Sequence, residues 1–546
     1  MNSRFSIAAL SKTLNSLSSI KLSVSIFTVS LCLFLPFLGR THLFDWDEIN
    51  FAECAREMLV SGNYLSVQID FQPFWEKPPL FIWMQVVSMK LFGVSEFSAR
   101  LPNAICGAVT LSLLFLIGER IRNRNIGLLW AACFGCSLLP HFYFHSGIID
   151  PWFNLFIAIS LIGLYEFFIR KGKPIILFVS AIAAGLAVLT KGPVALLVIG
   201  GVSFLFACFN LKAILNRWLY LLLWAFVALL AGLSWFIWLW FAGYQSVISQ
   251  FIEYQIRLLT QGEAGHGQPW FYHPVVLFFG CFPISIPALA GMIRVIKTQF
   301  FQKERSQGSE FSLLMLIFFG FVLLLFSAVT TKIVHYSSLC YFPITFFAAE
   351  WLNSEKSKST FTNYLTLVLG LITGLAVFAL PFAGMYISNN YSHIAELGIV
   401  KDAFAMENLK AEVNWTLCGA LPGFALLVGA IGFVYFLKKQ NPNGGYAFLF
   451  VANLIMLLTA LPLIVPKIER ITQGAAIDYF ISKQNKRTEI ITMGYKSYAQ
   501  FFYAQKQEGI GLDTVYISKC NSKADILAEK PKLNVLWEKN GFVAYE

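Results

Sequence analysis

The sequence predicts an all-α polytopic membrane protein with about 13 transmembrane helices and a small α/β domain at its C-terminal end. Three observations lead there. Of the 546 residues, 57% are hydrophobic and 13% are charged, a balance that excludes an ordinary soluble globular protein. Apolar runs of roughly 17–25 residues, long enough to cross a bilayer, recur along the chain. The net charge of +11 comes from short basic clusters between these runs, which indicates a topogenic role rather than a nucleic-acid surface.

The predicted spans follow from these runs. They are 22–39, 98–118, 126–145, 151–169, 174–190, 193–210, 217–241, 271–293, 311–329, 336–351, 362–386, 414–437 and 446–465. The run 79–92 is apolar but too short to cross comfortably, and we interpret it as an interfacial helix.

Lysine and arginine mark one side of the membrane. Basic clusters precede the first span and follow the second, fourth, sixth, eighth, tenth and twelfth, so all fall on the same side if the count is right. By the positive-inside rule this side is the cytoplasm, which predicts a cytoplasmic N-terminus and an external C-terminus. Any chemistry carried by the opposite loops therefore faces away from nucleotide pools.

The longest external loop carries two acidic clusters. It spans about 40–97 and contains Asp45, Asp47 and Glu48, then a segment with the periodicity of a short amphipathic surface helix, then Glu76-Lys77. Consecutive side chains cannot point the same way, so one of Asp47 and Glu48 can face a cavity while the other holds backbone or a partner. A partly desolvated carboxylate is a natural general base. The alternative is a merely solvated loop.

Other polar groups are predicted on the same external side. Asp150 precedes a proline at a helix start and could simply be a cap. Lys191 lies between two apolar runs and needs an anion. The loop with Glu263 and His266 and the turn 331–336 add further charge and a phenol. Acids, lysines and histidines converging at one membrane surface suit a phosphate-linked lipid substrate.

The composition becomes polar after the last span. We predict a membrane domain at 1–465 and an external α/β domain at 466–546, with strands near 488–494, 514–518 and 534–538. Most cysteines lie within apolar runs, and only Cys54 and Cys520 are expected to be accessible to solvent.

Taken in order, these motifs resemble the lipid-linked-sugar glycosyltransferases of the GT-C type, specifically the group of aminoarabinose (lipid A) transferases and protein O-mannosyltransferases. The resemblance covers most of the membrane part. It rests on the following segments: Asp47-Glu48 with FAECAREM (51–58), WEKPP (75–79), Asp150, LTKGP (189–193), GHGQPWFY (265–272) and TKIVHY (331–336).

The resemblance implies roles for individual residues. The catalytic carboxylates would be Asp47, Glu48 and Asp150, with Asp47 as the base. A divalent metal, if one is used, would be held by Glu76 and His266. The side chains that bind the donor phosphate would be Lys77, Lys191, Lys332, Tyr336 and Arg56. The group often carries arginine where this chain has Asn50, which leaves the sugar and acceptor open.

The resemblance also implies partners and a location. The donor would be a polyprenyl-phosphate-linked sugar, the acceptor an envelope glycolipid such as lipid A or a protein, and the location the bacterial inner membrane with a periplasmic active site. A transporter or flippase of lipid-linked or anionic solutes is the alternative. It would place charges near mid-membrane and break helices in paired halves, whereas these charges cluster at one surface. A scaffold subunit that retained the fold without activity is a third possibility.

Overall fold

A computed structural model describes residues 17–260, 268–301, 308–329, 331–355, 359–486, 488–509, 511 and 513–546. Within these residues, nine helices are long and apolar enough to cross a membrane. They are α5 (Glu96–Ile121), α8 (Asp150–Phe168), α9 (Pro174–Lys191), α10 (Val194–Leu215), α11 (Trp218–Phe241), α15 (Ser309–Ala328), α17 (Thr360–Asn389), α20 (Leu421–Lys438) and α21 (Pro442–Leu463). A tenth span is formed if α13 (Tyr272–Gly280) and α14 (Ser285–Ile296), which meet at a bend of 115°, count as one.

The other three predicted spans are apolar helices that are short or broken. The first is α2 (Ser19–Phe34), with 16 residues. The third is divided into α6 (Arg124–Gly135) and α7 (Leu138–Tyr143). The tenth begins as a 3₁₀ helix, η2 (Val334–Cys340), and continues as α16 (Tyr341–Leu352). A hydropathy run records apolar length but not an interruption of the backbone, so the number 13 stays a prediction.

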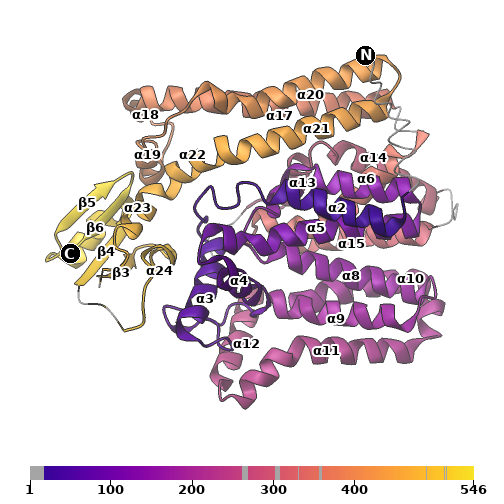
Figure 1. Ribbon diagram of the computed structural model, residues 1–546, viewed down its shortest axis with the longest axis horizontal. Coiled ribbons are helices and arrows are strands. Elements are labelled where there is room, and N and C mark those ends of the chain that lie inside the picture. Colours follow the sequence, from indigo (N-terminus) through magenta and orange to yellow (C-terminus); the bar gives the residue numbers. More distant parts are fainter. Residues whose placement is uncertain are drawn as a thin grey trace.

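The long helices lie roughly side by side, and several shorter helices and the C-terminal strands gather at one end (Figure 1). That end holds α3 (Asp47–Ser61), α12 (Gln245–Thr260), α18 (Tyr391–Glu396), α19 (Ala403–Asn408) and the C-terminal strands. The helices α17, α20 and α21 form a layer along one side of the bundle. Because α3 and the C-terminal strands share one end, a site built there can draw on segments from the whole chain.

The predicted amphipathic segment forms α3, but this helix is not a surface helix. Residues 48–58 are all buried, including the charged ones. Helix α4 (Leu80–Phe92), the apolar run predicted to be interfacial, packs against it, and α24 (Ala499–Ala504) covers another side. Cys54 is therefore fully buried, which corrects the expectation of an accessible thiol, while Cys520 is partly exposed.

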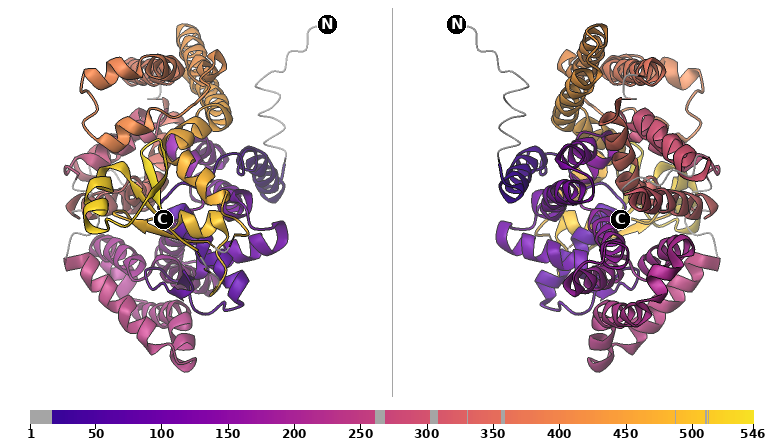
Figure 2. Two further views of the ribbon diagram at one scale, coloured as in Figure 1. Left: turned by 90° about the vertical axis from the view of Figure 1, so that its left-hand side faces the viewer. Right: turned by 90° about the vertical axis from the view of Figure 1, so that its right-hand side faces the viewer.

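The C-terminal segment forms the predicted small α/β unit. Its four-stranded sheet has the order β3-β4-β6-β5, in which β3 and β4 are parallel and the other pairs antiparallel. The strands are β3 (Thr488–Met493), β4 (Asp513–Lys519), β5 (Val535–Lys539) and β6 (Phe542–Tyr545), with helices α24 and α25 (Lys523–Glu529) beside them. In end-on view the strands lie across the end of the helical bundle (Figure 2).

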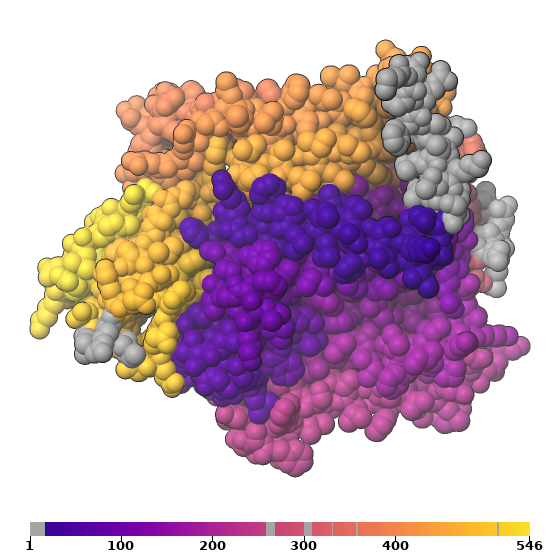
Figure 3. Space-filling view, in the orientation of Figure 1, coloured from indigo at the N-terminus to yellow at the C-terminus, as the bar shows by residue number. Residues whose placement is uncertain are grey.

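The polypeptide passes from the last span into this unit without a loop. Helix α21 continues through α22 (Val465–Glu469) and a π-helical turn η5 (Arg470–Gly474) into α23 (Ala475–Ile481). The surface view shows C-terminal residues abutting the N-terminal segment that carries α3 (Figure 3). The predicted division at 465/466 falls within this helical run and remains a prediction.

Candidate functional site

Two carboxylates and a histidine lie together at one end of the bundle. Asp47 is in the first turn of α3, and Asp150 is the first residue of α8. The imidazole Nε2 of His335, in η2, is 3.4 Å from Oδ2 of Asp47 and 4.0 Å from Oδ2 of Asp150. The side chain of Asp47 is 30% exposed and that of Asp150 only 3%, so Asp47 is the accessible carboxylate of the pair.

Lys191 joins this cluster from the end of α9. Its ammonium Nζ is 2.6 Å from Oδ1 of Asp150. The same nitrogen lies 5.2 Å from the ring centre of Tyr336 and 5.5 Å from that of Phe153. The aromatic faces and the carboxylate fix the position of the charge, as cation–π contacts and a buried ion pair do. Lys191 therefore has the anionic partner that its position between two apolar runs required.

Lys77 is a second cation at the site. It is partly buried, and its Nζ lies 5.6 Å from the ring centre of Tyr254, on α12. Within the described part of the chain, this ammonium forms no hydrogen bond or ion pair. Burial lowers the pKa of Lys77 from its ordinary value, and the charge of Lys191 acts in the same direction while that of Glu76 opposes it. An ammonium held this way is ready to accept an anionic ligand.

Two other predicted phosphate ligands follow different patterns. Tyr336 lies beside the central cluster, with its ring 5.2 Å from that of His335. Lys332 is buried, and its Nζ donates a 2.8 Å hydrogen bond to the carbonyl of Val329. The ammonium of Lys332 thus already serves to hold its own turn.

Glu48 and Arg56, predicted as catalytic and phosphate-binding, instead hold the buried helix α3 in place. Glu48 forms a two-point ion pair with Arg100, at 2.9 Å and 2.8 Å, and also accepts from the amides of Phe44 and Gly147. These contacts lower the pKa of Glu48 against the opposing effect of burial, with Arg100 as the chief stabilising partner.

Arg56 pairs in the same way with Glu53, at 2.7 Å and 2.6 Å. Successive residues on a helix point about 100° apart, which is why Asp47 faces the cluster and Glu48 does not. Glu48 thus accepts four hydrogen bonds inside the protein, and Arg56, which is 2% exposed, is the buried partner of Glu53.

The described neighbours of Glu76 are an ammonium and a phenol. Its Oε1 lies 3.5 Å from the ammonium of Lys496, and its Oε2 accepts from the hydroxyl of Tyr254 at 3.4 Å. The cation that faces this carboxylate in the structure is therefore the ammonium of Lys496. His266 lies outside the described residues, so its pairing with Glu76 stays a prediction.

Sequence reasoning missed several groups that the fold brings to the site. His335 belongs to the quoted TKIVHY segment, yet its position between two carboxylates has no counterpart in the sequence pattern. Tyr254 and Lys496 come from α12 and from the segment after β3, and no motif marks them. They are found only by contact in space with Glu76 and Lys77.

The chain is similar to known proteins in sequence and in fold. The family model described as dolichyl-phosphate-mannose-protein mannosyltransferase matches residues 76–238. The undecaprenyl phosphate-alpha-4-amino-4-deoxy-L-arabinose arabinosyl transferase of Pectobacterium carotovorum is 26% identical over 451 residues, covering 78% of each chain.

Solved structures show the same fold. The crystal structure of ArnT from Cupriavidus metallidurans bound to undecaprenyl phosphate has a TM-score of 0.74 with 16% identity, covering 97% of this chain and 98% of that one. The apo form of the same protein has a TM-score of 0.72. The chain is a multi-pass membrane glycosyltransferase whose sequence is similar to those of aminoarabinose transferases and protein mannosyltransferases and whose fold is similar to that of ArnT.

Proposed function

We propose that the protein transfers a sugar from a polyprenyl-phosphate donor to an acceptor at the periplasmic face of the bacterial inner membrane. The observation that carries the proposal is the cluster at one end of the bundle. There His335 contacts both the accessible carboxylate of Asp47 and that of Asp150, the partner of Lys191, and the charges of Asp47 and Lys191 act on the ammonium of Lys77. In this orientation the N-terminus is cytoplasmic and the C-terminal sheet periplasmic.

The proposed reaction is a direct displacement at the anomeric carbon. The bond between this carbon and the phosphate oxygen breaks, and the lipid phosphate leaves with the electron pair. The acceptor oxygen forms the new bond from the opposite face and gives its proton to Asp47. The charge that develops on the phosphate is stabilised by Lys77 and Lys191. No nucleotide is needed, because the lipid phosphate is itself the leaving group.

Two further residues position these groups. Asp150 fixes the ammonium of Lys191 at 2.6 Å. His335 lies within 3.4 Å of Asp47 and holds that carboxylate toward the cluster. The carboxylate pair thus divides its work, with Asp150 orienting a cation and Asp47 free to accept a proton.

An apolar groove supports a polyprenyl chain as part of the donor. It has a volume of about 310 Å³ and lies between α10 and α15. The lining side chains are Leu205, Ile317, Gly320, Phe321, Leu324 and Leu325. Helix α10 begins just after Lys191, and α15 ends just before Lys332. A prenyl chain in the groove would therefore run toward the basic cluster that binds its phosphate.

We expect Gly320→Leu to weaken donor binding. A side chain at position 320 meets open space in the groove, so the leucine fills the volume without a clash inside the protein. Overfilling an apolar site typically costs ~1–3 kcal/mol, and we expect the KM for the donor to rise about tenfold. The matched control is Gly200→Leu on the exposed face of α10, where a Cβ also meets nothing within 4 Å. Equal donor KM values for both variants would contradict the placement of the chain in this groove.

The proposed function is tested by reconstituting the purified protein with undecaprenyl-phosphate sugars and envelope acceptors. We expect release of undecaprenyl phosphate and an acceptor mass increased by one sugar residue, measured by mass spectrometry. The donor with 4-amino-4-deoxy-L-arabinose, named for relatives of this chain, is the first to test, and hexosyl donors are the second. Lipid A, polysaccharide and protein fractions from cells with and without the protein identify the acceptor. Movement of the donor across vesicles without sugar transfer would favour the flippase instead.

A further inference from the structure

The carboxylate of Glu76, which precedes Lys77, forms an ion pair with Lys496 from the C-terminal part of the chain. Glu76 and Lys77 are neighbours in sequence, and the charge of Glu76 acts on the ammonium of Lys77. In the structure, Oε1 of Glu76 faces Nζ of Lys496 at 3.5 Å, and the hydroxyl of Tyr254 donates to Oε2. The side chain of Glu76 is 20% exposed and that of Lys496 is 59% exposed.

Two aromatic rings hold Lys496 in this place. Its Nζ lies 4.8 Å from the ring centre of Trp46 and 5.5 Å from that of Tyr498. The two rings are themselves 5.2 Å apart. The amide of Asn50, turned to satisfy its neighbours, donates to the carbonyl of Trp46 at 2.9 Å and accepts from its indole nitrogen at 3.0 Å. The rings of Trp46 and Tyr498 therefore form an aromatic cradle that holds the ammonium of Lys496 beside Glu76.

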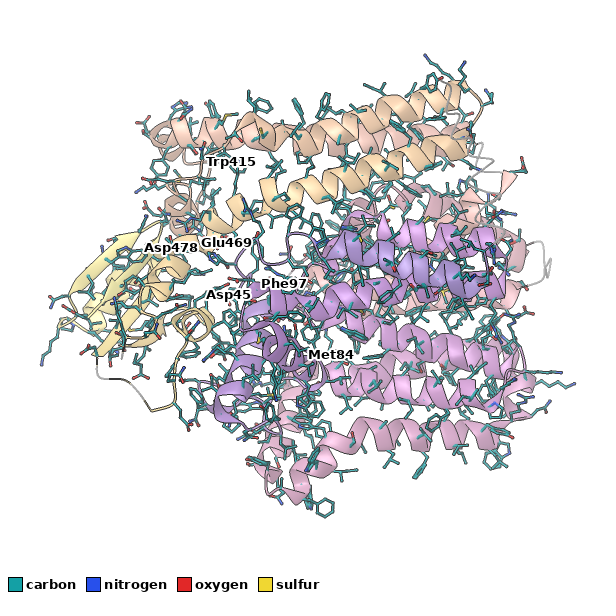
Figure 4. All side chains as sticks on the ribbon, in the orientation of Figure 1. Asp45, Met84, Phe97, Trp415, Glu469 and Asp478 are labelled. Atoms are coloured by element: carbon teal, nitrogen blue, oxygen red, sulfur yellow. The ribbon has the colours of Figure 1, made fainter. Side chains whose placement is uncertain are left out.

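This cradle joins two parts of the chain that are remote in sequence. Trp46 directly precedes Asp47, whereas Lys496 and Tyr498 follow β3 of the C-terminal sheet. The residues just before Trp46 are also bonded to the C-terminal part of the chain. The side-chain amide of Gln473 accepts a hydrogen bond from the backbone amide of Asp45 and donates one to the carbonyl of Leu43. Figure 4 labels Asp45 and Glu469 at this junction between the C-terminal unit and the bundle.

The ion pair between Lys496 and Glu76 affects the charges around Lys77. The charge of Asp150 is matched by Lys191, and that of Glu76 by Lys496. Among the described residues, the ammonium of Lys77 contacts the ring of Tyr254 and forms no ion pair, although the charges of Glu76, Asp47 and Asp150 act on it from a greater distance. If Glu76 lost Lys496, its carboxylate would become available to Lys77 and would compete with an anionic ligand for that ammonium.

We propose that Lys496 is a positioning residue for donor binding: it neutralises Glu76 and so keeps Lys77 available for the donor phosphate. The C-terminal unit thereby completes the donor side of the site from outside the membrane. The inference rests on the proposed function, because it takes the ligand of Lys77 to be a lipid phosphate.

The test measures equilibrium binding of undecaprenyl phosphate to the full-length protein, together with the donor KM. We expect Lys496→Met to weaken binding about fivefold. Adding Glu76→Gln removes the competing charge, so the double variant is expected to bind within about twofold of the wild type. A purely structural role of Lys496 would not be rescued by a second loss at Glu76. The matched control is Lys523→Met, which removes an exposed 2.6 Å pair with Glu538 in the same unit and should leave binding unchanged.

The outcomes separate this inference from the proposed function. Wild-type protein that does not bind undecaprenyl phosphate would overturn both. Wild-type binding that Lys496→Met leaves unaltered would overturn the inference alone. So would a double variant that binds as weakly as the single one.

Discussion

Replacing Asp47 by asparagine is expected to lower kcat by about 10²–10⁴-fold while donor binding stays near the wild-type value. Asparagine keeps the size of the side chain but cannot accept the acceptor's proton. The carboxylate of Asp47 is the accessible one at the site, and its neighbour His335 lies 3.4 Å away. The measurement is single-turnover transfer by purified protein, with undecaprenyl phosphate binding determined in parallel.

Glu48→Gln is the comparison that separates chemistry from folding. Glu48 adjoins Asp47 in sequence but bonds Arg100 and two backbone amides in the interior. Breaking one partner of a buried ion pair typically costs about 3–5 kcal/mol, so this variant should unfold at a lower temperature. Asp47→Asn should unfold as the wild type does. Transfer by Asp47→Asn within a few-fold of the wild-type rate would end the assignment of Asp47 as the base.

The contrast between these two residues shows how far the sequence could lead. It could predict that Asp47 and Glu48 divide between a cavity and a partner, because helical geometry separates neighbouring side chains. It could not name Arg100, 52 positions away, as the partner of Glu48. The resemblance pointed to both carboxylates as catalytic, and only the fold distinguishes them.

Helix α3 shows why burial was misjudged. Its Glu, Arg and Ala pattern is typical of a surface helix, and the composition of a single segment cannot reveal what covers it. Here the cover comes from α4 and from α24, which follows about 450 positions later. The same long-range packing buries Cys54, which a local pattern had predicted to be accessible.

Most spans could be predicted because hydropathy over some twenty residues is a local property. The breaks within them could not, since α6–α7, α13–α14 and η2–α16 each interrupt a continuous apolar run. One of these breaks brings a residue to the site: η2 carries His335 between Asp47 and Asp150. The irregular segment η2 thus makes the tenth predicted span uncertain and also places His335 at the site.

The second large effect is expected at Lys77. Lys77→Met removes a cation that stabilises the departing phosphate, and we expect kcat/KM for the donor to fall about 10²–10³-fold. Lys77→Arg keeps the charge and should retain most of the donor affinity, although its flat guanidinium differs in shape from an ammonium. Donor kinetics of both variants, with acceptor at saturation, provide the measurement. Equal losses for Met and Arg would mean that the site requires the shape of lysine and not its charge.

The pH dependence of kcat/KM for the donor distinguishes charge from shape independently. Burial lowers the pKa of Lys77 below its ordinary value of 10.5. A lowered pKa means that the ammonium loses its proton as the pH rises, and does so earlier than a free lysine. The wild-type profile should therefore decline on the alkaline side below pH 10.5. In Lys77→Arg this decline should move to higher pH, because a guanidinium stays protonated throughout. If the alkaline decline of kcat/KM has the same midpoint in Lys77→Arg as in the wild type, another group causes the decline. That result would contradict the assignment of Lys77 as the group that binds the phosphate.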